Sequence, residues 1–559
     1  MQLNGAQIVV QTLIEQGVTD IFGYPGGQVI NIYDALYEYK DKINHYLTAH
    51  EQGAAHAADG YSRATGKVGV CIATSGPGAT NLVTGIATAM LDSIPMVAIT
   101  GNVPCSLIGK DSFQEIDITG VTLPITKHNF FVSNIADLAD TLREAFRIAK
   151  SGRPGPVLVD IPKDVQLAKY DFEPQAIVEK TPLPKVKESL IDRAAALIND
   201  AKKPYIYVGG GAAGLGLGKA ILDFAEKIGA VIGCSFMGLS AVPQNSERFL
   251  GMQGMHGHYA SSMAQNEADL ILAVGVRFSD RATGNVSKFA KQSKIIQLDP
   301  DSAEINKNVL VELGLVGDVA DAFGRIAKKC NASEKPDWFA RVKALKEEEN
   351  RFEDEIAAAN TAPLPPKTVL EIINAVKPKN TVIATDVGQH QMWTAQYVEF
   401  DGPRQIVSSG GLGTMGFGLG AAIGAYVSTK NPVVLITGDG SFGMNLNELA
   451  TAVTYKLPIV IVLMNNGVLG MVRQWQSLFF GKRYSNTVLA RQTDFVQLAK
   501  AFGAEGVKAE TPVEFKRALE GAFKSCKPTV IDVRIDKDEM VLPMLPPGGS
   551  ISDIITKVK

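Results

Sequence analysis

The sequence predicts an α/β protein of three consecutive α/β domains with mainly parallel sheets. Its 559 residues exceed what one hydrophobic core usually organises, and the length suggests about three to four domains. Hydrophobic residues make up 46% and charged residues 20%, which is typical of a globular chain. Short apolar runs without strict alternation recur between longer amphipathic stretches. This pattern favours parallel strands that are covered on both faces.

Two charged, proline-containing stretches divide the chain. Residues 171–189 have the composition of a linker. Residues 341–355 are expected to form an exposed helix, and prolines follow it at 363, 365 and 366. We therefore expect an N-terminal domain at residues 1–170, a central domain at 190–330 and a C-terminal domain at 367–545.

Each segment alternates expected strands with expected helices. Periodicity does not decide the order of the strands within a sheet. The expected strands are residues 68–74 and 96–100, then 204–208, 230–234, 270–274 and 294–298, then 381–384, 432–437 and 459–463; the expected helices include 53–64, 136–149 and 445–454.

Charge and cysteine content exclude several classes of protein. The net charge is −3, so the chain has no electrostatic signature for nucleic acid or an anionic membrane surface. No apolar run has the roughly 18–20 residues of a membrane span, and no signal peptide is visible. The five widely spaced cysteines form no CxxC pair and indicate a reducing compartment. We expect a cytoplasmic protein that binds neither nucleic acid nor a membrane. The cysteines are Cys71, Cys105, Cys234, Cys330 and Cys526.

An acid and an amide follow two neighbouring strands of the third segment. Gly438, Asp439, Gly440 and Ser441 come directly after one expected strand, and Asn466 lies 27 residues beyond Asp439, after the next. One strand–helix–strand unit of this length brings both side chains to the carboxyl edge of a parallel sheet. Carboxylate, amide and carbonyl oxygens suit Mg²⁺ or Ca²⁺ bound together with diphosphate oxygens.

The central segment has a glycine pattern that does not predict a nicotinamide site. Residues 209–214 follow an expected strand and spell GxGxxG, but residues 235–246, after the next strand, contain no Asp or Glu. Further along, Arg277 and Arg281 lie four residues apart with Asp280 between them. Such a pair can clamp phosphate oxygens, although an internal salt-bridge network has the same spacing.

The GDG…NN arrangement resembles the diphosphate-binding motif of thiamine-diphosphate enzymes. The resemblance implies that Asp439, Asn466 and the backbone carbonyl of Val468 hold Mg²⁺. It also implies that Glu51, in the run His50-Glu51-Gln52, is the catalytic glutamate that hydrogen-bonds the aminopyrimidine ring.

The same resemblance assigns roles to three glycine-rich loops, at residues 23–27, 75–81 and 409–416, whose backbone can pack against a flat cofactor. Met415 is implied as the apolar residue that forces the cofactor to bend, and the Gly413 carbonyl as an aminopyrimidine contact. Gln389 and His390 match the diphosphate-binding loop, together with the run Gly438, Asp439, Gly440 and Ser441.

Over essentially its full length the chain resembles the catalytic large subunits of the biosynthetic acetohydroxyacid synthase (acetolactate synthase) family. The motifs that carry the resemblance are residues 22–27, 50–52, 112–115, 151–156, 160–163, 386–392 and 470–475. The implied reaction decarboxylates pyruvate on thiamine diphosphate and condenses the hydroxyethyl unit with a second ketoacid. Pyruvate as acceptor gives 2-acetolactate and 2-ketobutyrate gives 2-aceto-2-hydroxybutyrate, at the start of branched-chain amino-acid biosynthesis. The implied FAD contacts are Arg153, Met255, His256, Arg277, Asp280, Arg281, Asp299 and Asp318.

Further roles follow from the resemblance. Gln114 and Phe113 line the active site, and the Gly27 amide lies by the reacting carbon. Lys163 lies at the channel mouth, while Trp475 and Arg281 shape the acceptor pocket. The sequence departs from the family pattern at Ser279, where Asp is usual, at Gly420, where Pro is usual, and at Val468, where a polar residue is common.

Several alternatives stay open at this point. A catabolic acetolactate synthase shares the thiamine site but lacks the arginine pair and the Gln-Trp feature, so Arg277, Arg281 and Trp475 speak against it. A pyruvate oxidase would use the flavin for electron transfer, and a flavin-binding scaffold would not need Glu51 together with the GDG…NN pair. The family's active site forms across a subunit interface, which implies a homodimer or a tetramer. A regulatory small subunit is a possible partner, and its effector and the acceptor preference are left open.

Overall fold

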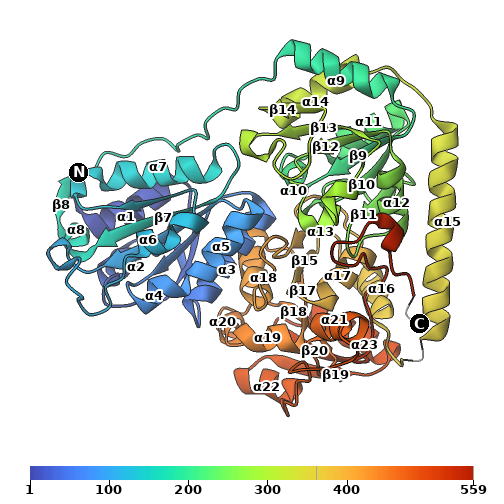
Figure 1. The fold of residues 1–559 in the computed structure, drawn as a ribbon. Coiled ribbons are helices and arrows are strands. Elements are labelled where there is room, and N and C mark those ends of the chain that lie inside the picture. The colour runs from blue at the N-terminus through green and yellow to red at the C-terminus, as the bar shows by residue number, and fades with distance from the viewer. Residues whose placement is uncertain (361, 558–559) are drawn as a thin grey trace.

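The computed structural model describes residues 1–360 and 362–557. Three six-stranded parallel sheets follow one another along the chain, each flanked by helices, and they confirm the predicted α/β class. In Figure 1 the first sheet lies at the left, the second at the upper right and the third at the lower right. No helix within the described residues is long and apolar enough to cross a membrane.

The first sheet has the order β3-β2-β4-β5-β7-β6, and a short antiparallel pair, β1 and β8, lies beside it. The strands are β1 (Gln2–Asn4), β2 (Asp20–Gly23), β3 (Asn44–Leu47), β4 (Gly69–Ala73), β5 (Met96–Asn102), β6 (His128–Phe131), β7 (Pro156–Pro162) and β8 (Lys169–Asp171). The helices are α1 (Gly5–Glu15), α2 (Ile30–Glu38), α3 (Glu51–Thr65), α4 (Pro77–Asn81), α5 (Val83–Asp92), α6 (Ile118–Thr122), α7 (Leu138–Lys150) and α8 (Lys163–Leu167).

The second sheet has the order β11-β10-β9-β12-β13-β14. Its strands are β9 (Pro204–Val208), β10 (Val231–Cys234), β11 (Phe249–Met252), β12 (Leu270–Val274), β13 (Lys294–Asp299) and β14 (Leu313–Val316). The helices are α9 (Glu188–Asp200), α10 (Gly210–Ala213), α11 (Gly218–Ile228), α12 (Tyr259–Glu267), α13 (Asp280–Thr283), α14 (Val319–Lys329) and the long α15 (Pro336–Ala359), which runs down the right side of Figure 1.

The third sheet has the order β16-β15-β17-β18-β20-β19. Its strands are β15 (Val382–Thr385), β16 (Ile406–Val407), β17 (Val433–Gly438), β18 (Val460–Asn465), β19 (Glu505–Ala509) and β20 (Thr529–Arg534). The helices are α16 (Pro366–Val376), α17 (Gln389–Tyr397), α18 (Gly418–Thr429), α19 (Asp439–Asn445), α20 (Glu448–Thr454), α21 (Gly470–Phe479), α22 (Phe495–Phe502) and α23 (Pro512–Lys524).

The expected elements agree with the observed ones at most positions, and a difference occurs directly after β17 in the third domain. The sequence predicts a glycine turn after β17 and a helix over residues 445–454. In the structure a helix begins at once, at Asp439, and a short break at residues 446–447 separates α19 from α20. The GDG segment therefore spans the strand end and the helix start: Gly438 is the extended N-cap residue, and Asp439 and Gly440 lie in the first turn of α19.

Helices α3 and α18 join the first and third domains through glycines. A Cβ at Gly60 would collide with the Ala421 carbonyl, and a Cβ at Gly424 would collide with the Ala57 carbonyl. These glycines let the two helix backbones approach each other closely. One continuous hydrophobic core then runs from strands of the first sheet into strands of the third. In Figure 1 the two helices lie side by side where the left and right parts meet.

Candidate functional site

The first and third sheets have the same strand order. When the strands of each sheet are numbered from 1 in chain order, both sheets have the order 2-1-3-4-6-5. The second strand is added on one side of the first strand and the third strand on its other side, so the strand order reverses between the first and third strands. Open parallel sheets bind ligands at this switch point, beside the carboxyl ends of the strands. The loops after β2 and β4 meet there in the first domain, and those after β15 and β17 meet there in the third.

A cleft of about 510 Å³ marks the switch point of the third sheet. The amino ends of α17 and α21 open into it, and backbone N–H groups at helix amino ends favour anions such as diphosphate. Residues that line the cleft include these sequence-predicted ones: Gln389, His390, Met415, Gly438, Asp439, Gly440, Ser441, Asn466 and Val468.

The three predicted metal ligands lie together in this cleft. Asp439 Oδ2 accepts a hydrogen bond from the Gly467 amide at 3.1 Å, and Asn466 Oδ1 accepts one from the Val468 amide at 3.1 Å. Burial raises the pKa of Asp439 to about 6. Burial disfavours the charged carboxylate, and a cation bound beside it would offset this penalty. No lysine or arginine is among the described residues that line the cleft, so no side chain there supplies the positive charge. The donor set therefore fits Mg²⁺.

His390 supplies the cleft with a neutral imidazole. Burial lowers its pKa to about 3. Within the described part of the chain its Nε2 atom has no hydrogen-bond partner. A Cβ at Gly438 would lie 3.1 Å from His390 Nδ1, so glycine leaves the ring its room. Gln389 is fixed beside it, because its Nε2 donates to Gln474 Oε1 at 3.0 Å and to the Glu539 carbonyl at 2.7 Å.

The loop of Gly413 and Met415 is held over the cleft by a buried aspartate. Asp386 Oδ1 accepts hydrogen bonds from the Gly416 amide at 2.7 Å and the Gly418 amide at 3.3 Å. Gly413 has φ +70°, a conformation that glycine adopts without strain. Met415 Cε lies 3.8 Å from where a Cβ of Gly440 would stand. The apolar methionine therefore covers the polar part of the cleft.

Glu51 begins helix α3 at the switch point of the first sheet. Asn81 Nδ2 donates to Glu51 Oε2 at 2.9 Å, and a Cβ at Gly78 would lie 3.3 Å from Glu51 Oε1. Gly27 is exposed, and a Cβ there would have no atom within 4 Å. Lys163 Nζ donates to the Gly27 carbonyl at 3.2 Å. This edge therefore holds one carboxylate beside open backbone.

Gln114 and Phe113 belong to the same edge. Gln114 has φ +62°, and its Cα lies 3.0 Å from where a Cβ of Gly76 would stand. Phe113 is 84% exposed, so within one chain its ring has little to pack against.

Within one chain, Glu51 is not among the residues that line the third-domain cleft. The residues that line the third-domain cleft all lie between Val387 and Ile535, whereas the hydrogen-bond partner of Glu51, Asn81, belongs to the first domain. Trp475 is half-buried on α21 and packs edge-on against Phe479, with ring centroids 5.9 Å apart. Its Nε1 has no partner among the described residues, and it does not line the cleft.

The central sheet has the strand order 3-2-1-4-5-6, which is that of dinucleotide-binding folds. At its switch point a Cβ on Gly209 would collide with the Gly275 carbonyl, so the GxGxxG pattern serves close packing of two loops. Three predicted residues lie at this same edge: Arg277 follows β12, Asp299 is the last residue of β13, and Asp318 follows β14. Burial raises the pKa of Asp299 to about 6.

Arg153 belongs to the first domain but reaches the same edge of the central sheet. There it donates a hydrogen bond to Glu304 Oε1 at 2.6 Å. Asp318 is already engaged, since it caps α14 by accepting the Asp321 amide at 3.0 Å. The arginine-rich edge, the strand order and the glycine loops fit a dinucleotide such as FAD. Position 279 precedes α13, and Ser279 makes no side-chain cap there.

Met255 and His256 are buried near the C-terminal tail, whereas Asp280 and Arg281 are exposed. Arg281 is largely exposed and points Nη1 towards Met255 Sδ at 3.9 Å, and burial lowers the pKa of His256 to about 4. The tail contacts the loop of Met255, because the Leu545 amide donates to the Met255 carbonyl at 2.7 Å. Asp280 is exposed and pairs with Arg281 at 3.9 Å.

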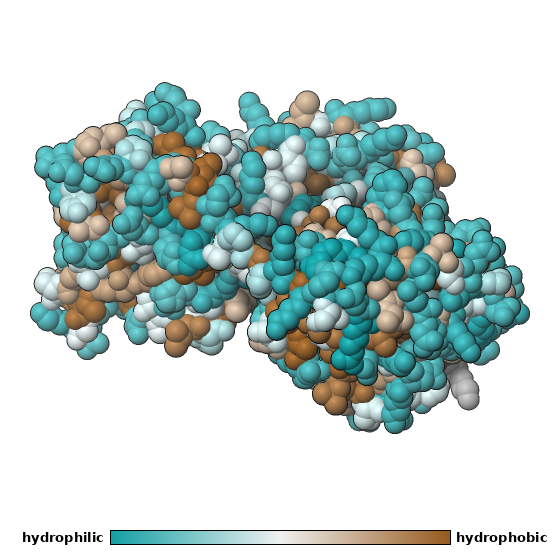
Figure 2. Space-filling view, turned by 90° about the horizontal axis from the view of Figure 1, so that it is seen from above, coloured by the Kyte–Doolittle hydropathy of each residue, from teal (hydrophilic) through white to brown (hydrophobic). Residues whose placement is uncertain are grey.

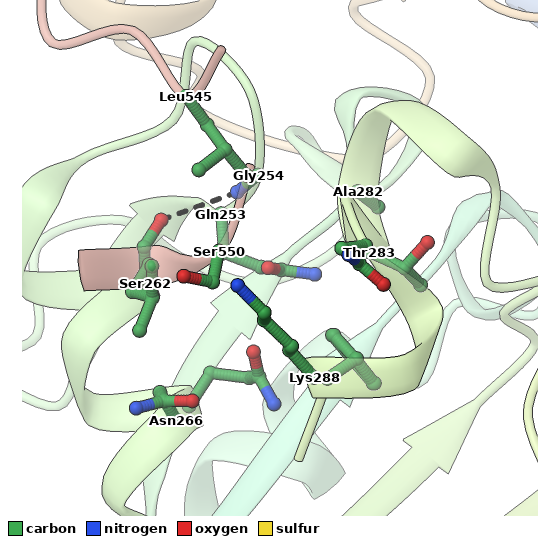
Figure 3. Close-up of a pocket in the computed structure, with 13 residues that line it drawn as sticks. Gln253, Gly254, Ser262, Asn266, Ala282, Thr283, Lys288, Leu545 and Ser550 are labelled. Carbon is green, nitrogen blue, oxygen red and sulfur yellow. Dashed lines mark hydrogen bonds between the residues drawn. The ribbon is translucent and has the colours of Figure 1, made fainter. Parts of the chain in front are cut away.

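Figure 3 shows a small cleft beside these loops, lined by Gln253, Asn266, Thr283, Lys288 and Ser550 together with apolar residues that include Leu545. The dashed line in the figure is the Gly254 amide donating to Ser262 Oγ at 3.2 Å.

The sequence alone does not reveal two residues at the sites. Asn81 lies in the glycine-rich loop at residues 75–81, and only its hydrogen bond to Glu51 shows that it belongs to the site. Glu448 follows α19 and contacts residues about 400 positions earlier in the chain, so no local pattern could reveal it. The departure at Gly420 has a packing reason, since a Cβ there would lie 2.9 Å from the Gly53 carbonyl oxygen.

Comparison with protein families agrees with this architecture. The thiamine pyrophosphate enzyme N-terminal TPP binding domain matches residues 3–121, the central domain matches 191–326 and the C-terminal TPP binding domain matches 386–533. The fold and the two switch-point sites thus define a thiamine pyrophosphate enzyme.

Similar curated proteins extend over the whole chain. Acetolactate synthase isozyme 2 large subunit of Escherichia coli (strain K12) is 46% identical over 562 residues, covering 100% of both chains. The acetolactate synthase large subunit of Corynebacterium glutamicum is 45% identical and covers 99% of this chain and 90% of its own. A probable acetolactate synthase large subunit of Methanocaldococcus jannaschii is 44% identical and covers 100% and 96%. The chain belongs to the acetolactate synthase large-subunit family.

Proposed function

We propose that this protein decarboxylates pyruvate and joins the resulting two-carbon unit to a second pyruvate or to 2-ketobutyrate. The products would be 2-acetolactate and 2-aceto-2-hydroxybutyrate, which lead to the branched-chain amino acids. The observation that carries the proposal is the cleft at the third switch point, which Asp439, Asn466 and His390 line together. His390 Nε2 has no hydrogen-bond partner among the residues that the structure describes. The relatives are named acetolactate synthase large subunits, and these names support the acetolactate-forming reaction.

Thiamine diphosphate, held through Mg²⁺, is the cofactor that we propose for this cleft. It supplies the stabilised carbanion chemistry that decarboxylation and carbon–carbon bond formation need. Asp439, Asn466 and the Val468 carbonyl would hold the cation. His390, neutral at physiological pH because burial lowers its pKa to about 3, would offer a hydrogen bond to a diphosphate oxygen without adding charge. Met415 would keep water from the apolar side.

Glu51 is the residue that we propose for proton transfer. Its carboxylate is half-buried at the start of α3, and Asn81 fixes one of its oxygens. The other oxygen is left to meet a ring nitrogen of the cofactor. We further propose that the Gly27 amide, Gln114 and Phe113 line the reacting side, with Lys163 at the entrance.

A second copy of the chain would complete each site. Large apolar residues are exposed on both the first and the third domain, and an interface between two copies would remove such residues from water. In the first domain they include Leu107, Ile108, Phe113, Val121 and Leu123, and in the third Leu412, Met444, Val472, Phe479, Phe480 and Val488. The face seen in Figure 2 is largely hydrophilic, with apolar residues in separate patches. We therefore propose a homodimer, or a tetramer of two dimers, with Glu51 of one copy facing Asp439 of the other.

Two further partners belong to the proposal. FAD would lie along the carboxyl edge of the central sheet, where Arg153, Arg277 and Arg281 can meet its phosphates and Met255 and His256 its rings. The relatives are named large subunits, so we also propose a regulatory small subunit.

A product assay tests the function. Protein supplied with thiamine diphosphate, Mg²⁺ and FAD should form 2-acetolactate from pyruvate alone, and both acetohydroxyacids when 2-ketobutyrate is added. Omitting Mg²⁺ or thiamine diphosphate is the control and should abolish both products. Acetyl phosphate or acetate formed with consumption of oxygen would indicate a pyruvate oxidase and overturn the proposal.

A further inference from the structure

The carboxylate of Glu448 joins the third domain to the start of the catalytic helix. Glu448 is the first residue of α20 and its side chain is fully buried. Its Oε1 accepts a hydrogen bond from the His50 amide at 3.0 Å, and its Oε2 accepts one from the Ala49 amide at 3.2 Å. Thr451 Oγ1 donates to Oε2 at 2.7 Å and fixes the carboxylate from its own helix.

The two amides belong to the residues immediately before Glu51. His50 is the N-cap of α3, so its position decides where the first turn of the helix begins. Gly53, in the first turn of the helix, has no side chain, and a Cβ there would collide with the Glu448 carboxylate. The fit between this carboxylate and the helix start is therefore tight on both sides.

We propose that Glu448 is a positioning residue for Glu51: by holding the amides of residues 49 and 50, it sets where the catalytic carboxylate stands. The proposal rests on the proposed function of Glu51. Burying a carboxylate is costly unless it is fully hydrogen-bonded, and here three donors satisfy it. A nonpolar contact could join the domains without that cost, so the polar contact indicates control of backbone position.

The contact has a consequence for the dimer. Asp439 and Glu448 begin the two consecutive helices α19 and α20. If each active site takes Asp439 from one copy and Glu51 from the other, this helix pair binds the metal of one site and holds the glutamate of the second.

Hydrogen exchange of the cofactor-free protein tests the contact directly. Glu448→Gln keeps the size but turns an NH₂ group towards a backbone N–H, so the amides of residues 49 and 50 should exchange roughly tenfold faster. Glu349→Gln is the matched control. Glu349 is also buried and accepts the amides of Tyr259 and Ala260, at 3.1 and 3.2 Å, in the central domain. The Glu349→Gln variant should speed hydrogen exchange of the amides of residues 259 and 260 and leave exchange of the amides of residues 49 and 50 unchanged.

A double-mutant cycle separates positioning from simple domain stability. Glu448→Gln should lower turnover roughly tenfold in the wild-type background but by less than about twofold in the Glu51→Gln background, because its effect passes through Glu51. The dissociation constant for thiamine diphosphate with Mg²⁺ should stay within about twofold, since the diphosphate cleft is untouched. Equal losses of turnover in both backgrounds would overturn the proposal. Full turnover of Glu51→Gln alone would instead refute the proposed role of Glu51 and leave the proposed reaction standing, because the product assay tests that reaction separately.

Thr451→Val provides a variant that keeps Glu448 and preserves side-chain shape. It removes only the donor at 2.7 Å, so exchange at residue 49 should rise and turnover should fall by roughly twofold to threefold. If Glu448→Gln does not fold, this variant decides the question. Unchanged exchange at residues 49 and 50 in Thr451→Val would then reject the positioning role.

Discussion

The first and third domains have one strand order but carry opposite kinds of site. In the third domain the switch point holds buried polar groups: burial raises the pKa values of Asp386 and Asp439 to about 6 and lowers that of His390 to about 3. In the first domain the switch point holds one half-buried carboxylate, Glu51, between the buried Gly76 and Gly78 and the exposed Gly27. The comparison teaches that topology fixes where a ligand lies, whereas burial decides whether the site grips charge or exchanges a proton.

The first domain also has a deeply buried aspartate, but away from the switch-point loops. Asp160 lies on β7 and accepts hydrogen bonds from Thr100 Oγ1 at 2.7 Å and Asn102 Nδ2 at 2.6 Å. Burial raises its pKa to about 6, as for Asp386. Buried acids are thus common to both sheets, and only in the third domain does one of them line the cleft.

The largest expected effect tests the proton-transfer half of the comparison. Glu51→Gln keeps the shape of the side chain but removes the carboxylate, so turnover should fall roughly 10²-fold or more while thiamine diphosphate still binds. Steady-state rates and a cofactor titration measure the two quantities. Glu520→Gln, an exposed change on α23, is the control and should leave both intact. Near-normal turnover in Glu51→Gln would show that another group transfers the proton.

The metal-binding half of the comparison predicts a different response. Asp439→Ala removes the only carboxylate from the expected Mg²⁺ ligands, so the Mg²⁺ and thiamine diphosphate concentrations needed for half-maximal activity should rise at least roughly tenfold. Activity titrations with each component measure this shift. Unchanged titration curves would mean that the cation binds elsewhere.

A smaller effect is expected on the choice of acceptor ketoacid, which we propose the third domain makes through Trp475. Trp475→Leu should lower the preference for 2-ketobutyrate over pyruvate by about tenfold, because one methylene in an apolar pocket gives roughly 10–200-fold discrimination. The ratio of the two acetohydroxyacids formed in a competition assay measures the preference. Decarboxylation of the first pyruvate should change much less. The same product ratio in both proteins would place acceptor choice outside this helix.

The junction between the two domains should respond in stability more than in chemistry. Gly420→Ala places a Cβ 2.9 Å from the Gly53 carbonyl oxygen and the His56 Cβ, so unfolding should become easier by about 1–3 kcal/mol. Gly324→Ala on α14 is the matched control, because its Cβ meets no atom within 4 Å and alanine favours helix. Thermal unfolding of both variants measures the difference. A Gly420→Ala protein as stable as wild type would show that α3 and α18 can separate without cost.

The smallest expected effect is a change in how stability depends on pH. Asp386 has a pKa raised to about 6, so its contribution to stability is present at low pH and is lost as the pH rises through 6. In Asp386→Asn the amide oxygen can still accept the Gly416 amide, and Thr437 can reorient its hydroxyl. The melting temperature of this variant minus that of wild type should therefore rise by a few degrees between about pH 4 and 7 and then stay constant. A difference that does not vary with pH would contradict the raised pKa.

The sequence was sufficient for the fold class and for most strands, because apolar runs such as residues 204–208 and 270–274 appear as β9 and β12 with the same bounds. It also predicted that Asp439 and Asn466 lie side by side, since consecutive parallel strands end at the same edge of a sheet. These inferences succeed because they depend on local hydrophobicity and on a short connection, both of which are written along the chain.

Tertiary structure alone decided the rest. The order of the strands, and with it the three switch points, depends on which helix packs on which face, and no local pattern records that. Gly420 appeared as a departure from a family pattern until its contact with Gly53 showed a close helix crossing. Glu448 looked like an ordinary helical glutamate, because its partners lie about 400 residues away. Local residue patterns determine which segments are buried, whereas contacts between distant segments determine which polar groups the burial brings together.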